Sequence, residues 1–247
     1  MSSCCIKGFK WDGEPQGRET TLAENPAYIT GSNSDVAILV IHDLFGWTFP
    51  NIRLLADAYA EEANATAYVP DFFGGEVLNA EILSKDPVEW GPLDIPGFVA
   101  RNSKDVRWPE ILACARTLRS QYKRVAAIKF CFGGWAVFRL GSKDNEDLVD
   151  CISTAHPSWL TKEEIQNVGV PVQILAPEHD PAFTPELKEF SNKVIPTLGI
   201  DYDYQYFPNV EHAFAVRGDP GNDMERKGMV RAKKAVVYWL NQYLHGN

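Results

Sequence analysis

Continuous apolar runs recur along the chain at intervals that leave room for a helix between them. The clearest run covers residues 36–41, where six consecutive positions are apolar and most are β-branched. A run without polar alternation is typical of a strand that is covered on both faces. The pattern predicts strands over residues 36–41, 66–69, 124–130, 151–155, 172–176 and 202–207.

Between these runs, apolar positions recur at helical spacing, best seen in residues 50–63, where Pro50 suits the first turn. The spacing predicts helices over residues 50–63, from Pro109 to Tyr122, and over 133–140, 161–167, 185–196 and 223–244. The strand–helix alternation predicts an α/β fold, with a mostly parallel central sheet and helices on both faces. Residues 5–9, 20–23 and 27–30 are expected to form extended edge segments.

Composition and charge narrow the class of protein. The chain has 247 residues, 45% of them hydrophobic and 23% charged, which fits one α/β domain over residues 1–247. A formal net charge of −9 argues against a nucleic-acid or anionic-membrane surface. We find neither a signal-peptide pattern in residues 1–10 nor an apolar run long enough to span a bilayer. The five cysteines (4, 5, 114, 131 and 151) fit neither a disulfide framework nor a zinc site, so we expect a reducing, cytoplasmic location.

The residues that follow the predicted strands are the candidates for chemistry, because sites in such sheets lie at the carboxyl ends of the strands. Cys131 stands between a strand and a helix, followed by Gly133 and Gly134, in the setting of a nucleophile elbow. The positive end of the next helix favours a thiolate there. A buried structural cysteine is the alternative interpretation of this position.

Two further groups favour the catalytic interpretation. Asp180 follows the strand at 172–176, and His212 follows the strand at 202–207. The order nucleophile, acid, histidine is that of α/β-hydrolases, in which the histidine takes a proton and the acid orients its ring. The backbone N–H of Phe132, next to the nucleophile, is half of a predicted oxyanion hole.

Several motifs along the chain resemble the dienelactone hydrolase family, in its eukaryotic (fungal-type), carboxymethylenebutenolidase-like branch. They are CC at 4–5, GEPQG at 13–17, IHDLFG at 41–46, VPDFFG at 69–74, FCFGG at 130–134, HPS at 156–158 and HAFAVRGD at 212–219. The resemblance implies an α/β-hydrolase fold and a Cys131–Asp180–His212 triad. It also implies an oxyanion hole from the amides of Leu44 and Phe132.

The resemblance further implies an acid that interacts with the resting cysteine, and Asp43 occupies its place, one methylene shorter than the usual glutamate. Substrates of the family are small esters and lactones, often bearing a carboxylate, and no cofactor is implied. Arg217 is a candidate to grip such a carboxylate, or else forms a salt bridge with Asp219 or Asp223. His156 and Trp159 are expected to line the pocket.

Lys129 departs from the family, which has glycine two residues before the nucleophile. We expect its side chain to point outward; the alternative is that it reaches the site and lowers the pKa of the thiol or holds a substrate carboxylate. His42, His179 and His212 lack the spacing of metal ligands, so no metal is expected.

The sequence thus predicts a hydrolase that cleaves a small ester or lactone through a cysteine acyl-enzyme. Two rivals remain. One is a fold relative that catalyses cyclisation, isomerisation or thioester release with His212 and Asp43 as acid and base. The other is a binding protein whose elbow is disabled by Lys129. Fold resemblance fixes neither the substrate nor the oligomeric state.

Overall fold

A single twisted sheet organises the molecule. The computed structural model describes residues 8–78 and 94–246, and within them the strands pair in the order β1-β2-β4-β3-β5-β6-β7-β8. β1 and β2 pair antiparallel at one edge, and from β4 onward all neighbours pair parallel. The strands are β1 (Arg18–Leu22), β2 (Asn25–Thr30), β3 (Val36–Ile41), β4 (Thr66–Pro70), β5 (Arg124–Phe130), β6 (Cys151–Ala155), β7 (Val172–His179) and β8 (Tyr202–Glu211).

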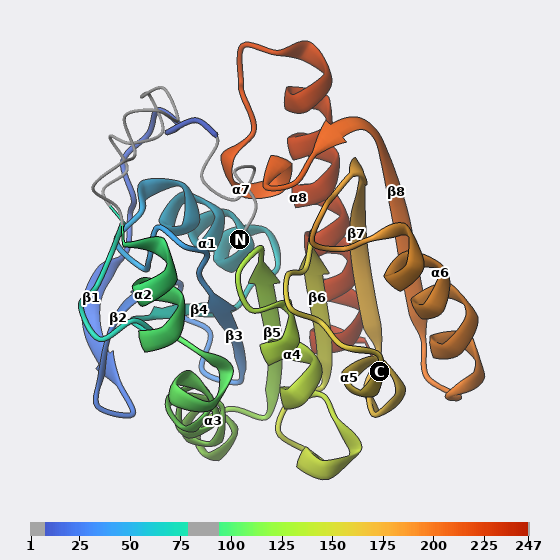
Figure 1. The fold of residues 1–247 in the computed structure, drawn as a ribbon. Helices are drawn as coiled ribbons and strands as arrows, with labels where there is room; N and C mark the ends of the chain where they lie inside the picture. The colour runs from blue at the N-terminus through green and yellow to red at the C-terminus, as the bar shows by residue number, and fades with distance from the viewer. Residues whose placement is uncertain (1–7, 79–93, 247) are drawn as a thin grey trace.

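Helices cover both faces of this sheet. They are α1 (Pro50–Glu62), α2 (Ile95–Arg101), α3 (Lys104–Gln121), α4 (Gly134–Leu140), α5 (Lys162–Gln166), α6 (Pro185–Val194), α7 (Phe214–Arg217) and α8 (Asp223–His245), with 3-10 turns η4 (Lys143–Asn145) and η5 (Ile195–Thr197). In Figure 1, α8 runs behind β6 and β7, while α4 and α5 lie in front of the sheet. The predicted α/β-hydrolase architecture, mostly parallel and covered on both faces, is confirmed.

The period-two geometry of β3 explains why its sequence is apolar throughout. Alternate side chains, such as Val36 and Ile38, pack with α1 and α8 in one core. The residues between them, such as Ala37 and Leu39, pack with α3 and α4 in a second core. A strand between two cores has no polar face, so every position of β3 is buried. The uninterrupted apolar run at 36–41 could therefore be recognised as a strand from the sequence.

Most predicted elements are present, with several differences in their bounds. β7 and β8 run on to His179 and Glu211, past the predicted ends at 176 and 207. α3 begins at Lys104 rather than at Pro109, which lies inside the helix, where its missing N–H removes one hydrogen bond. α2 and α7 were not predicted. Of the predicted edge segment 5–9, residues 5–7 lie outside the described residues, as does the Cys4-Cys5 motif, and residues 8–9 form no strand.

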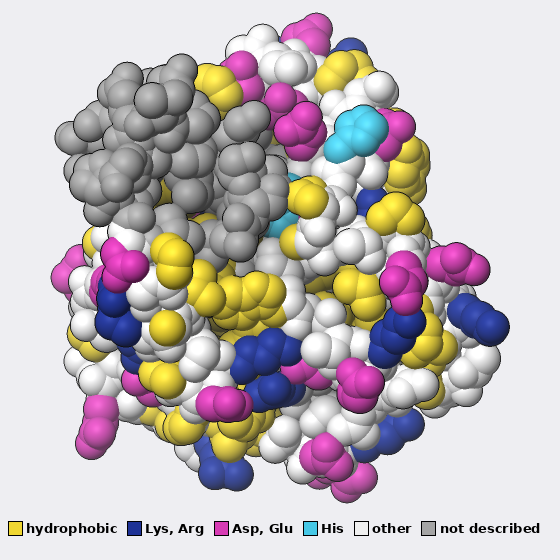
Figure 2. Space-filling view, viewed as in Figure 1, with side chains coloured by type: hydrophobic (Ala, Val, Ile, Leu, Met, Phe, Trp, Pro, Cys, Tyr) yellow, Lys and Arg dark blue, Asp and Glu magenta, His cyan; other side chains and the backbone are white. Residues whose placement is uncertain are grey.

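The parallel strands bring their carboxyl ends to one side of the sheet. The arrowheads of β5, β6 and β7 point to the upper side of Figure 1, where α7 lies. The face drawn in Figure 2 shows acidic and basic side chains interspersed. Within the described ranges, every helix is too short or too polar to cross a membrane.

Candidate active site

Cys131 occupies a sharp turn between β5 and α4. Its φ of 54° is left-handed, a conformation that costs about 1 kcal/mol or more for a side chain other than glycine. Hydrogen bonds hold the turn: the Cys131 N–H donates to Ala155 O at 3.3 Å and to His156 Nδ1 at 3.1 Å. Gly134 lies so close to Pro157 that a Cβ there would stand 2.2 Å from the proline Cβ. This strand–turn–helix geometry is that of a nucleophile elbow.

The loops after β7 and β8 bring an acid and a histidine to this turn. His212 Nε2 lies 3.0 Å from Cys131 Sγ, and His212 Nδ1 lies 2.8 Å from Asp180 Oδ1. The same Asp180 oxygen accepts hydrogen bonds from the N–H groups of Ala182 at 2.8 Å and Phe183 at 3.0 Å. These two amides fix the carboxylate, and the carboxylate fixes the imidazole ring.

The surroundings of His212 favour its protonated form. Burial by itself would lower the pKa of this imidazole, but the negative charge of Cys131 and the hydrogen bonds to Asp180 and Cys131 outweigh it. Together they raise the pKa to about 10. The thiol and the imidazole are coupled, so this direction of shift is the one expected when a Cys131 thiolate faces the protonated ring.

Leu44 and Phe132, predicted to form an oxyanion hole, have backbone N–H groups for which the described part of the chain offers no hydrogen-bond partner. The Leu44 loop is a tight turn in which the Gly46 N–H donates to Asp43 O at 3.1 Å. In the same turn the Phe45 N–H donates to Asp43 Oδ1 at 3.0 Å. An oxyanion hole requires N–H groups that are free to donate, and that these two form one stays a prediction.

Arg217 forms a salt bridge, which is one of the two sequence-based alternatives, and its role in gripping a substrate carboxylate stays a prediction. The expected salt-bridge partners were Asp219 and Asp223, but the guanidinium forms an ion pair with Asp43, and both side chains are fully buried. The guanidinium also lies 4.9 Å from the centroid of the Phe45 ring. Burial raises the pKa of Asp43, and the charge of Arg217 opposes that rise. Arg217 therefore forms a salt bridge as that alternative expected, but with Asp43 in place of Asp219 or Asp223.

His156 and Trp159 both contact the elbow, at Cys131 and at Phe132 respectively. His156 Nδ1 accepts the Cys131 N–H, so the proton of this neutral ring is on Nε2, and burial lowers its pKa well below the usual value. The Trp159 ring packs against Phe132, with ring centroids 4.4 Å apart. That both line the substrate pocket stays a prediction. No sequence signal indicated that His156 holds the backbone of Cys131.

Lys129 does not point outward, and our expectation on this point is wrong. Only 1% of the residue is exposed, and Nζ donates a hydrogen bond to the carbonyl oxygen of His42. β5 lies between β3 and β6, and the lysine side chain lies in a small crevice on one face of the sheet, together with Phe72, Phe132 and Trp135 among others.

Other features of the described residues lie apart from this site. A groove of about 560 Å³ runs along α8 and β8, lined by Arg226, Lys227, Arg231 and Lys234 among others, and contains none of the candidate residues. Within residues 8–78 and 94–246, no group of three His, Cys, Asp or Glu side chains is arranged to hold a metal ion.

The structural likeness extends over nearly the whole chain. A Klebsiella pneumoniae protein classed as a dienelactone hydrolase superposes with a TM-score of 0.71, covering 92% of this chain and 98% of that one at 16% identity. A dienelactone hydrolase-like promiscuous phosphotriesterase from metagenomic libraries gives a TM-score of 0.64 at 18% identity, covering 92% and 97%. At such identities the likeness shows the fold.

Sequence comparison is more specific. Hydrolase pyvD of Aspergillus violaceofuscus is 30% identical over 250 residues, covering 98% of this chain and 97% of that protein. The carboxymethylenebutenolidase homolog of Homo sapiens is 27% identical, with 97% and 96% covered. The sequence model of the dienelactone hydrolase family matches residues 26–244. This chain therefore belongs to the dienelactone hydrolase family and is an ester or lactone hydrolase.

Proposed function

We propose that this chain cleaves small esters or lactones through a thioester formed on Cys131. The observation that carries the proposal is the pair of short contacts, 3.0 Å from Cys131 Sγ to His212 Nε2 and 2.8 Å from His212 Nδ1 to Asp180 Oδ1. A nucleophile, a base and an orienting carboxylate in this order are suited to acyl transfer.

In the first half of the reaction, the Cys131 thiolate attacks the carbonyl carbon and the carbonyl electrons move onto oxygen. When the tetrahedral intermediate collapses, the bond to the leaving oxygen breaks, and His212 Nε2 gives that oxygen its proton. The products are a thioester on Cys131 and an alcohol, which in a lactone stays attached to the acyl chain. The raised pKa of His212 means that this proton is in place at the start of the cycle.

In the second half, water attacks the thioester carbon and gives a proton to the now neutral His212. The carbon–sulfur bond then breaks, which releases the carboxylic acid and restores the thiolate–imidazolium pair. Asp180 keeps its negative charge throughout and stabilises the imidazolium each time it forms.

The amides of Leu44 and Phe132 are proposed to bind the oxyanion in both halves. Removing one such donor typically costs about 10²–10³ in rate, so the hole is expected to make a large contribution. Trp159, packed 4.4 Å from the Phe132 ring and partly exposed, is proposed to contact the substrate beside this hole.

The substrate class is proposed from the relatives and from the charges at the site. The name of the human relative, carboxymethylenebutenolidase homolog, points to a small lactone. A carboxylate on that lactone would share the Arg217 guanidinium with Asp43, since the two side chains are already paired. His156 is proposed to hold the nucleophile in position, because its Nδ1 accepts a hydrogen bond from the backbone N–H of Cys131.

The test is turnover of a panel of small lactones and alkyl esters by the wild type, Cys131→Ala and His212→Gln. Both variants are expected to lose hydrolysis while keeping the wild-type melting temperature within a few degrees. Cys114→Ala, which alters another buried cysteine outside the site, is the matched control and should keep its activity. Hydrolysis by Cys131→Ala at the wild-type rate would refute the proposal.

A further inference from the structure

Lys129 is a buried cation to which the proposed mechanism gives no task. It stands in β5 two residues before Cys131, opposite Ile41 of β3 in the register of the sheet. Lysine normally extends its ammonium group to water along a flexible stem, and it is almost never fully buried unless that group is paired. The contacts of its Nζ atom therefore need an explanation.

This one side chain contacts both segments that carry the proposed oxyanion hole. Nζ donates to the carbonyl oxygen of His42, two residues before Leu44. Nζ also lies 5.9 Å from the centroid of the Phe132 ring. The stem passes under the elbow, because a Cβ built on Gly133 would stand 3.1 Å from Lys129 Cε. Lys129 thus joins the loop after β3 to the turn after β5.

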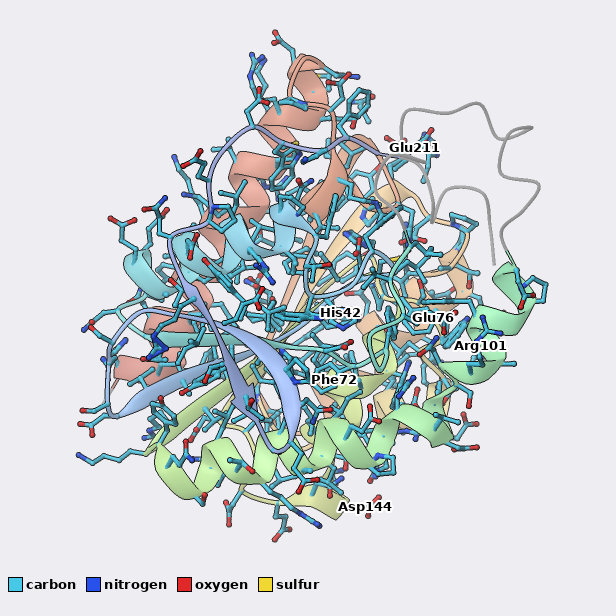
Figure 3. The ribbon with its side chains drawn as sticks, turned by 90° about the vertical axis from the view of Figure 1, so that its left-hand side faces the viewer. His42, Phe72, Glu76, Arg101, Asp144 and Glu211 are labelled. Atoms are coloured by element: carbon cyan, nitrogen blue, oxygen red, sulfur yellow. The ribbon has the colours of Figure 1, made fainter. Side chains whose placement is uncertain are left out.

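The His42 end of this connection is itself firmly held. The Phe72 N–H donates to His42 Nε2 at 3.0 Å, so the ring proton is on Nδ1, which donates to Asp43 O at 2.8 Å. Figure 3 shows His42 and Phe72 next to each other in the interior of the protein. Burial, with the charge of Lys129 second, lowers the pKa of His42 to about 3, which keeps the ring neutral. The hydrogen bond from Lys129 therefore reaches a loop after β3 that is already held in place by the contacts of the His42 ring.

We infer that Lys129 is a positioning residue, which holds the Leu44 loop against the Phe132 turn and so sets the spacing of the two oxyanion-hole amides. The inference rests on the proposed function, because it concerns the same acyl-transfer step. A misplacement of about 1 Å in such a site can cost about 10²-fold in rate. Nζ donates to the His42 carbonyl both as an ammonium and as an amine, so the connection persists when the lysine loses its proton.

The charges around Nζ allow positioning to be separated from electrostatics. Burial lowers the pKa of Lys129 to about 7; the charges of Cys131 and Asp43 oppose this fall and Arg217 adds to it. His42 and Arg107 line the same small crevice as the lysine. At about pH 9 most of the lysine is neutral, while its hydrogen bond to the His42 carbonyl remains.

The experiment compares two reactions of Cys131 at about pH 9, in the wild type and in Lys129→Met. One is the single-turnover acylation by p-nitrophenyl acetate, which passes through an oxyanion. The other is alkylation by iodoacetamide, mapped to Cys131 by peptide mass spectrometry, which needs the thiolate but no oxyanion hole. Lys123→Met is the matched control, since this lysine precedes β5 and its side chain is 77% exposed. Lys129→Gly is the second variant, in case the methionine does not fit.

Positioning predicts a split between the two rates. In Lys129→Met or Lys129→Gly, acylation should fall about 10- to 100-fold with KM little changed, while alkylation stays within about threefold. The inference is overturned if acylation is unchanged, or if both rates fall together. A wild type without a burst that maps to Cys131 would instead overturn the proposed function, and this inference with it.

Discussion

Replacing Asp180 with asparagine isolates the contribution of its charge. Asp180 Oδ1 accepts from His212 Nδ1 and from the N–H groups of Ala182 and Phe183. The carbonyl oxygen of an asparagine can keep all three hydrogen bonds. Its NH₂ group would then replace Asp180 Oδ2, which is buried and has no hydrogen-bond partner in the part of the chain that the structure describes. Asp180→Asn thus removes the charge and leaves the geometry in place.

The loss can be estimated from the distance. With 2.8 Å between His212 Nδ1 and Asp180 Oδ1, the charge centres are about 4 Å apart, which gives about 4 kcal/mol at an effective dielectric constant of about 20. This equals about a 10³-fold change in the ratio of the thiolate–imidazolium pair to the neutral thiol–imidazole pair. An unpartnered NH₂ group adds a cost of about 1–3 kcal/mol in folding stability.

The assay is the rate of iodoacetamide alkylation at Cys131 as a function of pH. In the wild type, we expect the thiolate in the neutral range, because His212 Nε2 lies 3.0 Å from Cys131 Sγ and its imidazolium form would stabilise the negative sulfur. In Asp180→Asn, alkylation should rise only where an ordinary thiol ionises, near about pH 8.5. Asp223→Asn, at an exposed carboxylate, should behave like the wild type. Neutral-pH alkylation of Asp180→Asn within about threefold of the wild-type rate would refute the reasoning.

Three further predictions follow from the same geometry. Arg217→Met removes the cation paired with the buried Asp43 carboxylate and should lower the free energy of unfolding, measured by urea denaturation, by about 3–5 kcal/mol. A decrease below about 1 kcal/mol would contradict a buried ion pair. Gly133→Ala, at a φ of +95° in a crowded turn, should lower the melting temperature more than Gly199→Ala, at a φ of +75° in open space, and equal shifts would argue against the crowding. Hydrolysis of an alkyl ester should decline as the pH rises through about 10, where His212 loses the proton for the leaving oxygen; a rate that stays level there would exclude His212 as that donor.

The candidate triad could be predicted because its position depends on topology. Cys131, Asp180 and His212 each follow a strand, and a parallel sheet brings the carboxyl ends of its strands together. Runs such as 36–41 predict strands because both faces are buried, so the sequence pattern and the packing carry the same information.

The errors arise where a partner distant in sequence decides the outcome. The salt-bridge alternative for Arg217 considered acids two to six positions away, but its partner is Asp43, 174 positions away. Lys129 was expected to reach solvent, because nothing in the sequence shows that a carbonyl of the β3 loop stands within its reach. The start of α3 was misplaced because a proline that usually begins a helix lies inside this one.

The most direct measurement is the intact mass of the protein after brief exposure to activated esters and small lactones. If Cys131 is the nucleophile, an acyl adduct should form, map to the peptide that contains Cys131, and be absent in Cys131→Ala and in His212→Gln. Turnover of the same esters and lactones with no adduct at Cys131 under single-turnover conditions, or with an adduct on a different residue, would contradict the cysteine acyl-enzyme.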